Sequence, residues 1–218
     1  MNILVVVAHP DDEVLGMGGT ILKHTQNKDD VFIQILTEGV SARDANRVEE
    51  QKEFAKECAR CLGAKGVIFG NFADQRLDTI PLLELADAVS RMISNCKPEI
   101  VYTHFWGDVN QDHRQVFEAV MIATRPIPNK CVKKVLCFET PSATEWRSLP
   151  DSCFCPNYFV DISQQLEGKI TAFNAYKPEV NNFPHPRSTE GITHLAGWRG
   201  STVGFNAAEA FFLIRELK

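Results

Sequence analysis

Residues 2–13 read NILVVVAHPDDE, and this stretch decides the fold. Its first part, Asn2 to Ala8, is a run of apolar, mostly β-branched residues without polar alternation, which is typical of a strand buried on both faces of a parallel sheet. The run stops at His9-Pro10, and a segment rich in small residues follows. A buried strand that turns directly into a helix indicates a βα unit.

The same alternation of strand and helix recurs along the chain. Further strands are predicted at residues 30–37, 67–69, 100–104 and 133–139, and helices at 49–62, 82–93 and from about 113 to 124. Alternation at this length implies right-handed βαβ crossovers. We therefore expect a three-layer, Rossmann-like α/β fold with a mostly parallel sheet, formed by a single domain over residues 1–218.

Composition narrows the classes of function. The net charge of -5 argues against a nucleic-acid binder, because such domains usually carry a basic face. The apolar runs are too short to cross a bilayer and no signal peptide pattern precedes them, so we expect no membrane span and a cytoplasmic protein. The seven cysteines are scattered and odd in number, which indicates reduced thiols. Homo-oligomerisation is left open.

The first polar cluster follows the first predicted strand. His9, Asp11, Asp12 and Glu13 place one imidazole and three carboxylates within five residues. If buried, these carboxylates would repel one another, and a divalent cation would compensate their charge. The alternative is a solvated turn and helix N-cap, where Asp is favoured by capping and by the helix dipole. Taken alone, this cluster leaves both interpretations open.

A second cluster, DVNQDH at residues 108–113, follows the predicted strand at 100–104. Because the carboxyl ends of parallel strands meet at one edge of a sheet, the two clusters can face one another. A catalytic tetrahedral site needs three protein ligands and one open position, and His9, Asp12 and His113 would supply them. Asp11, next to a ligand, is then placed to take a proton from water.

AHPDDE at 8–13 and DxNxDH at 108–113 resemble the PIG-L/LmbE family of metal-dependent N-acetylglucosaminyl deacetylases. GMGGT at 16–20, LTEG at 36–39, HPRS at 185–188 and AEAF at 208–211 are similar to one bacterial branch of that family. The resemblance covers most of the chain. AHPDDE is its specific element, whereas the other pieces are individually weak.

The resemblance implies a zinc-dependent hydrolase that removes an N-acetyl group from a small-molecule amino sugar or its conjugate. It implies that His9, Asp12 and His113 bind Zn²⁺, with Fe²⁺ as another candidate metal, and that Asp11 is the general base acting on metal-activated water. Glu13, Asp108 and Asp112 would orient the ligands from behind.

The sequence departs from the family pattern at Asn110, where many members have histidine in an HPDH motif. Asparagine can donate a hydrogen bond to an oxyanion but cannot deliver a proton near neutral pH. The acid role then passes to protonated Asp11 or to another group, for which His185 and His104 are the candidates. We also expect substrate contacts from Arg43, His104 and Arg187, although His104 can equally be a structural histidine.

Two other functions are consistent with parts of the sequence. The same metal centre could act as an amidase on a non-sugar amide or a thiol conjugate, because the motifs fix the chemistry more than the substrate. A non-catalytic nucleotide-binding module is suggested by Gly16, Gly18 and Gly19 after the first strand. Their spacing is not GxGxxG, and acidic residues precede them where a pyrophosphate would need backbone amides.

Overall fold

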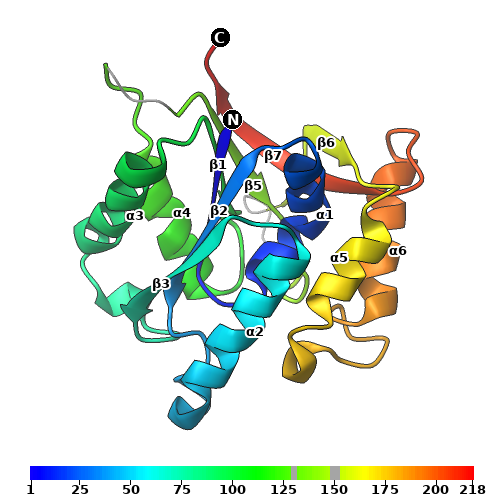
Figure 1. Ribbon diagram of the computed structural model, residues 1–218, viewed down its shortest axis with the longest axis horizontal. Coiled ribbons are helices and arrows are strands. Elements are labelled where there is room, and N and C mark those ends of the chain that lie inside the picture. The colour runs from blue at the N-terminus through cyan, green and yellow to red at the C-terminus, as the bar shows by residue number, and fades with distance from the viewer. Residues whose placement is uncertain (129–131, 148–152) are drawn as a thin grey trace.

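A seven-stranded sheet forms the centre of the computed structural model, which describes residues 1–128, 132–147 and 153–218 (Figure 1). The strands are β1 (Asn2–Val7), β2 (Asp30–Thr37), β3 (Gly66–Phe72), β4 (Ile100–His104), β5 (Lys134–Phe138), β6 (Tyr158–Asp161) and β7 (Ala208–Glu216). Their order in the sheet is β3-β2-β1-β4-β5-β7-β6. The first five strands are parallel, whereas β7 runs antiparallel to both of its neighbours.

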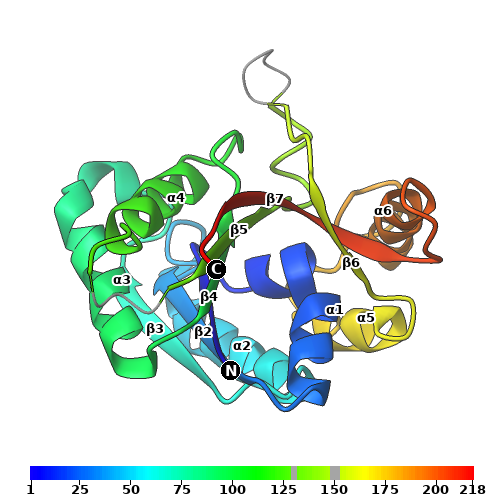
Figure 2. The same cartoon turned by 90° about the horizontal axis from the view of Figure 1, so that it is seen from above.

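Helices cover both faces of this sheet (Figure 2). They are α1 (Asp12–Gln26), α2 (Val48–Cys61), α3 (Leu82–Cys96), α4 (Gln111–Ala123), α5 (Leu166–Phe173) and α6 (Thr189–Ser201). Successive side chains of β1 point to opposite faces, so Ile3, Val5 and Val7 pack with α1, α2 and α5. Leu4 and Val6 pack with α3 and α4 on the other face. β1 is therefore buried on both faces, as its apolar run predicts.

The predicted three-layer α/β fold with a mostly parallel sheet is confirmed. The strand predicted at 67–69 is longer, because β3 extends over Gly66–Phe72. The sequence analysis assigned no elements after residue 139, where the structure has β6, α5, α6 and β7. Strand β7 also makes the sheet mixed, since it inserts antiparallel between β5 and β6.

The chain reverses direction across the sheet between β1 and β4. Strands β2 and β3 lie on one side of β1, and β4 and β5 lie on the other. In open α/β sheets, such a reversal leaves a crevice at the carboxyl ends of the two strands, where ligands bind. His9 follows β1 directly, and the segment that leads to His113 follows β4. Both polar clusters of the sequence therefore lie at the switch point.

The glycines after β1 lie inside α1 rather than in a phosphate-binding loop. A Cβ added at Gly16 would come within 2.2 Å of Phe138, and one at Gly19 within 2.8 Å of Ile162. Both positions thus allow α1 to approach its neighbours closely. This placement accounts for the glycines without a nucleotide.

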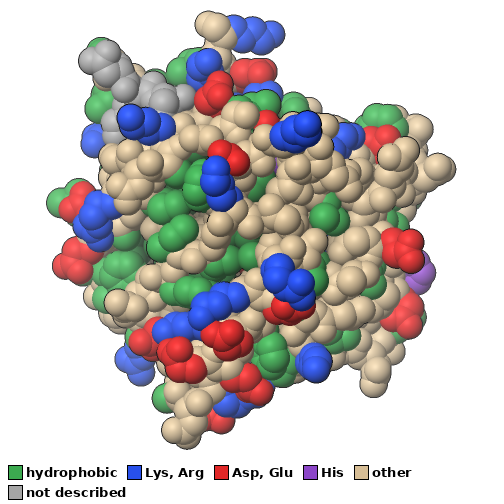
Figure 3. Space-filling model, in the orientation of Figure 1, with side chains coloured by type: hydrophobic (Ala, Val, Ile, Leu, Met, Phe, Trp, Pro, Cys, Tyr) green, Lys and Arg blue, Asp and Glu red, His purple; other side chains and the backbone are tan. Residues whose placement is uncertain are grey.

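The outer surface of α2 carries charges of both signs. Three pairs of residues three apart form ion pairs along it: Glu49–Lys52, Glu53–Lys56 and Glu57–Arg60. Figure 3 shows acidic and basic side chains next to one another at this end of the molecule. Spaced in this way, the charges support the exposed helix rather than forming a field of one sign.

Within the described residues, no helix is both long and apolar enough to cross a bilayer.

Candidate metal centre

The turn between β1 and α1 is fixed by its own side chains. Asp11 has a left-handed φ of 103°, which is uncommon for a residue other than glycine. The backbone N–H of His9 donates to Asp12 Oδ2 (2.9 Å), and that of Asp11 donates to Glu13 Oε2 (3.1 Å). The hydroxyl of Tyr176 donates to the other oxygen of Glu13 (2.6 Å). Glu13 therefore links the backbone of this turn to Tyr176 and fixes the conformation of the turn.

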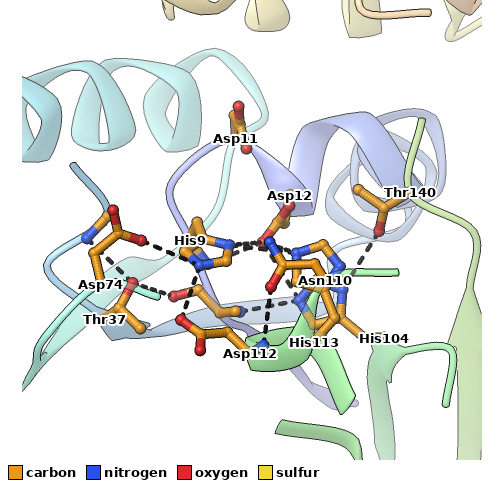
Figure 4. A network of polar contacts seen from close by, with 12 residues as sticks. His9, Asp11, Asp12, Thr37, Asp74, His104, Asn110, Asp112, His113 and Thr140 are labelled. Carbon is orange, nitrogen blue, oxygen red and sulfur yellow. Dashed lines mark hydrogen bonds and ion pairs between the residues drawn. The ribbon is translucent and has the colours of Figure 1, made fainter. Parts of the chain in front are cut away.

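Three ligand atoms from two distant segments converge beside this turn (Figure 4). The Nδ1 of His9 lies 3.2 Å from Asp12 Oδ2. The Nε2 of His113 lies 3.3 Å from the same oxygen and 3.3 Å from the Nδ1 of His9. All three side chains are buried. The structure thus brings together the three residues that the sequence analysis expects to bind metal.

This arrangement fits a single divalent cation. The ligand atoms of a tetrahedral site with bonds of about 2.0–2.1 Å lie roughly 3.3–3.4 Å apart, close to the spacing of 3.2–3.3 Å observed here. The second oxygen of Asp12, Oδ1, is buried without a hydrogen-bond partner among the described residues. Burial opposes a charge on His9, yet the carboxylates of Asp112 and Asp12 raise its pKa to about 10. The carboxylates of Asp12 and Asp112 therefore favour a positive charge at this position.

Both imidazoles are oriented by carboxylates on their far side. The Nδ1 of His113 lies 2.8 Å from Asp108 Oδ2, which leaves Nε2 to face the cluster. The Nε2 of His9 lies 3.2 Å from Asp112 Oδ2. Backbone N–H groups of Gln75 (2.8 Å) and Leu77 (3.0 Å) fix the Asp112 carboxylate in turn. Carboxylates placed in this way set the tautomer and direction of a ligating histidine.

Asp74 and Gln75 also reach His9, and the sequence analysis missed both. Asp74 Oδ1 lies 3.3 Å from His9 Nε2, and the side-chain amide nitrogen of Gln75 lies 3.2 Å from the same atom. The strand predicted from the sequence ends at Phe69, and no role is predicted for Asp74. Because β3 continues to Phe72, Asp74 stands at the same sheet edge as the other acids. An acid directly after a strand was the signal that could have found it.

His104 is not placed to contact a substrate, which corrects the substrate-binding expectation. Its side chain has no exposed surface, and its ring stacks on that of His113 with centroids 3.8 Å apart. The Nε2 accepts a hydrogen bond from the backbone N–H of Ala8 (3.0 Å). Burial, with a further contribution from His113, lowers the pKa of His104 to about 4. His104 is therefore a neutral packing residue behind His113.

A cavity of about 310 Å³ opens beside the cluster. Its walls include His9, Asp11, Arg43, Gln75, Asn110 and Arg187. This volume lies at the lower end of the range of about 300–1,000 Å³ that is typical of small-molecule sites. The expected base and two expected substrate contacts therefore share one cavity with a ligand of the candidate metal centre.

Asp11 stands apart from the ligand cluster (Figure 4). The Nη1 of Arg187 lies 2.8 Å from Asp11 Oδ2. Arg43 pairs with Glu179 (2.8 Å), which also lies 3.7 Å from Arg187. Burial raises the pKa of Asp11 well above its usual range, although Arg187 opposes the shift. Asp11 is thus a fixed carboxyl with an increased affinity for a proton.

Asn110 has a structural role that the sequence did not reveal. Its side-chain oxygen accepts from the backbone N–H of Asp112 (2.9 Å) and caps the N-terminus of α4. Figure 4 shows the amide group beside His9 and His113. The cap fixes the oxygen on the helix, and Asn110 is also one of the residues that line the cavity.

His185, the other expected proton donor, is not among the residues that line this cavity. Its Nδ1 accepts from the backbone N–H of Arg187 (3.0 Å), and its ring meets Trp146 edge to face. His185 therefore shapes the loop that presents Arg187.

Comparison with known proteins adds an independent finding. Residues 4–124 match the family model described as PIG-L: GlcNAc-PI de-N-acetylase. The uncharacterized deacetylase YaiS of Escherichia coli (strain K12) is 32% identical, covering 81% of this chain and 90% of that protein. Diacetylchitobiose deacetylase of Thermococcus kodakarensis is 29% identical, covering 82% and 70%. Among solved structures, N,N'-diacetylchitobiose deacetylase from Pyrococcus horikoshii has the same fold, with a TM-score of 0.80, 22% identity and coverage of 98% and 84%.

Proposed function

The chain belongs to the PIG-L family, and from this premise we propose that it is a metal-dependent deacetylase that hydrolyses the N-acetyl group of an amino sugar or amino-sugar conjugate. One observation carries the proposal. Three buried ligand atoms, spaced 3.2–3.3 Å apart, converge beside a cavity whose wall includes one of their residues, His9, and the expected base Asp11. Two relatives support an amino-sugar substrate by their names, which are diacetylchitobiose deacetylase and probable N-acetyl-alpha-D-glucosaminyl L-malate deacetylase 2.

His9, Asp12 and His113 would hold the metal. Two nitrogen donors and one oxygen donor suit Zn²⁺, and Fe²⁺ accepts the same donor set. A divalent cation bound there supplies Lewis acidity toward water and toward an amide carbonyl. Asp108 and Asp112 keep the two imidazoles directed at it.

The remaining steps fall to side chains of this chain. Asp11 takes the proton of the attacking water and, once protonated, returns it to the departing amine nitrogen. Arg187 holds the Asp11 carboxyl in one orientation through the 2.8 Å contact. The NH2 group of Asn110 donates to the oxygen of the tetrahedral intermediate. This assignment removes the need for His185 as an acid.

We also propose that residues 1–218 act as a single domain. Strands from both ends of the chain belong to one sheet, with β7 paired to β5. Arg187 reaches Asp11 from a segment far beyond the residues that match the family model. The active site therefore needs both ends of the chain.

The test is release of acetate from a panel of substrates by the zinc-loaded protein. N-acetylglucosamine, diacetylchitobiose and N-acetylglucosaminyl conjugates should release acetate, and Asp11→Asn protein is the matched control. N-acetyl amino acids and N-acetylated thiol conjugates belong to the same panel. Cleavage of these non-sugar amides without cleavage of any sugar would replace the proposed substrate class with the amidase alternative.

A further inference from the structure

Helix α1 is broken close to the metal centre. Met17 has φ -151° and ψ 26°, which lie outside the helical region, so residues 12–16 form a short first part and residues 18–26 a second part. Such a break deprives N–H groups of the second part and carbonyl groups of the first part of their partners. Every residue from Asp12 to Ile21 is buried, so these groups need hydrogen-bond partners within the protein.

A buried ion pair from the far end of the chain satisfies both sides of this break. Glu209, on β7, accepts from the backbone N–H of Gly19 (2.9 Å) and from that of Thr20 (2.6 Å). Lys169, on α5, donates to the carbonyl oxygen of Leu15 (2.9 Å) and to Glu209 Oε1 (2.7 Å). Figure 2 shows α1 lying beside α5 with β7 passing across it.

The signs of the two charges match the two helix ends that they touch. A carboxylate stabilises the positive N-terminal end of a helix, and an ammonium stabilises the negative C-terminal end. Glu209 lies at the start of the second part of α1, and Lys169 lies at the end of the first. An apolar pair of the same volume could fill this space. It could not accept hydrogen bonds from two backbone N–H groups or donate one to a carbonyl oxygen.

The first part of α1 carries a proposed metal ligand. It begins at Asp12, whose Oδ2 lies within 3.3 Å of both histidine nitrogens. A segment of five residues is too short to be stable as an isolated helix, so its position depends on what holds its two ends. The turn at Asp11 fixes one end, and the ion pair fixes the other. Metal sites tolerate displacements of only about 0.2 Å in ligand distance.

We propose that Lys169 and Glu209 are positioning residues for the metal centre, because together they fix the break in α1 and so the place of Asp12. The inference rests on the proposed function, since it needs His9, Asp12 and His113 to bind metal. It also joins two separate motifs of the sequence, GMGGT at 16–20 and AEAF at 208–211, in one contact.

The experiment measures the affinity of the metal-free protein for Zn²⁺ by competition with a chromophoric chelator, alongside the melting temperature (Tm). Glu209→Gln should weaken zinc binding by about tenfold, the lower end of the effect of groups that orient a ligand. The matched control is Ile21→Val, a buried position in the second part of the same helix. It should lower Tm while leaving zinc affinity within about twofold, because it does not touch the break.

A double variant, Lys169→Met with Glu209→Gln, separates positioning from the burial of an unpaired charge. In the double variant neither side chain is charged, so no charge is left buried without a partner. It therefore still tests the proposal if the Glu209→Gln protein fails to fold. Zinc binding that stays weak in the double variant supports the proposal. Wild-type zinc affinity in either Glu209 variant overturns it, as does an equal loss in Ile21→Val. A different result would overturn the metal site itself. That result is a wild-type protein that binds zinc no more tightly than the His113→Ala protein does.

Discussion

The two ends of the chain contribute different things to one site. His9, Asp11 and Asp12 follow β1, and His113 lies on α4 just after β4, so the reacting groups come from the part of the chain up to residue 113. The last third supplies the side chains that hold them. Arg187 pairs with Asp11, Tyr176 donates to Glu13, and Glu209 accepts from the backbone of α1.

This difference separates chemistry from geometry. Groups at the ends of parallel strands meet wherever the sheet forms, so their placement follows from local sequence. Groups on α5, on β7 and in the segment between α5 and α6 reach the site only through long-range packing, with contacts that span up to 190 residues in sequence. We call residues 1–113 the first region and the last third of the chain the second region. A change in the first region should abolish a step of the reaction. A change in the second region should disturb the position of a group that is still present.

The largest effect is expected at Asp11, in the first region. Asp11→Asn keeps the shape of the side chain but removes the base, so kcat should fall by about 10²–10⁴-fold. Zinc content, measured by elemental analysis, should not change, because Asp11 is not one of the three clustered ligand atoms. Exposed Asp78 gives the control variant Asp78→Asn, which should behave as wild type. Full activity in the Asp11→Asn protein would remove it from the mechanism.

Asn110 should show the next largest effect, and its two roles can be separated. Asn110→Ser keeps a residue that caps a helix about as well as asparagine, so Tm should hold. Serine is too short to reach an oxyanion, and loss of one such donor costs about 10²–10³-fold in kcat. Steady-state rates and melting curves on the same protein measure both quantities. A lower Tm with an unchanged kcat would mean that Asn110 only caps α4.

Much of the first region could be predicted from sequence because its signals are local. The apolar run over residues 2–8 gives β1, and acids with histidines after two strands give the ligand set. Where a local boundary was misjudged, the site prediction failed with it. Ending β3 at Phe69 instead of Phe72 removed Asp74 from the sheet edge.

The second region could not be derived in the same way. Strand β7 is apolar over residues 210–214 and could pair with any strand, and its antiparallel place between β5 and β6 depends on partners more than 40 residues away. His104 shows a related limit. It ends a strand at the site edge, but only the packing reveals that its ring lies behind His113 rather than in the cavity.

Arg187 tests whether the second region acts by position. Arg187→Gln leaves Asp11 in place but removes its charged partner, so kcat should fall by about 10–100-fold, as for other groups that orient a functional side chain. Arg199→Gln is the matched control, because Arg199 pairs with Glu139 at 2.6–2.7 Å and lies outside the cavity wall. Equal losses of kcat in the two variants would indicate a general loss of packing.

The smallest effect is expected at Tyr176, where the second region supports the turn without touching a reacting group. Tyr176→Phe removes the 2.6 Å hydrogen bond to Glu13 and leaves a buried carboxyl oxygen without this donor. The free energy of unfolding in urea should fall by about 1–3 kcal/mol. Tyr158→Phe, on the edge strand β6 and half-buried, should change it by less than about 0.5 kcal/mol. If Tyr176→Phe instead lowers kcat as much as Arg187→Gln, then the hydrogen bond from Tyr176 to Glu13 also fixes the position of Asp11. Tyr176 and Arg187 would then support Asp11 together rather than separately.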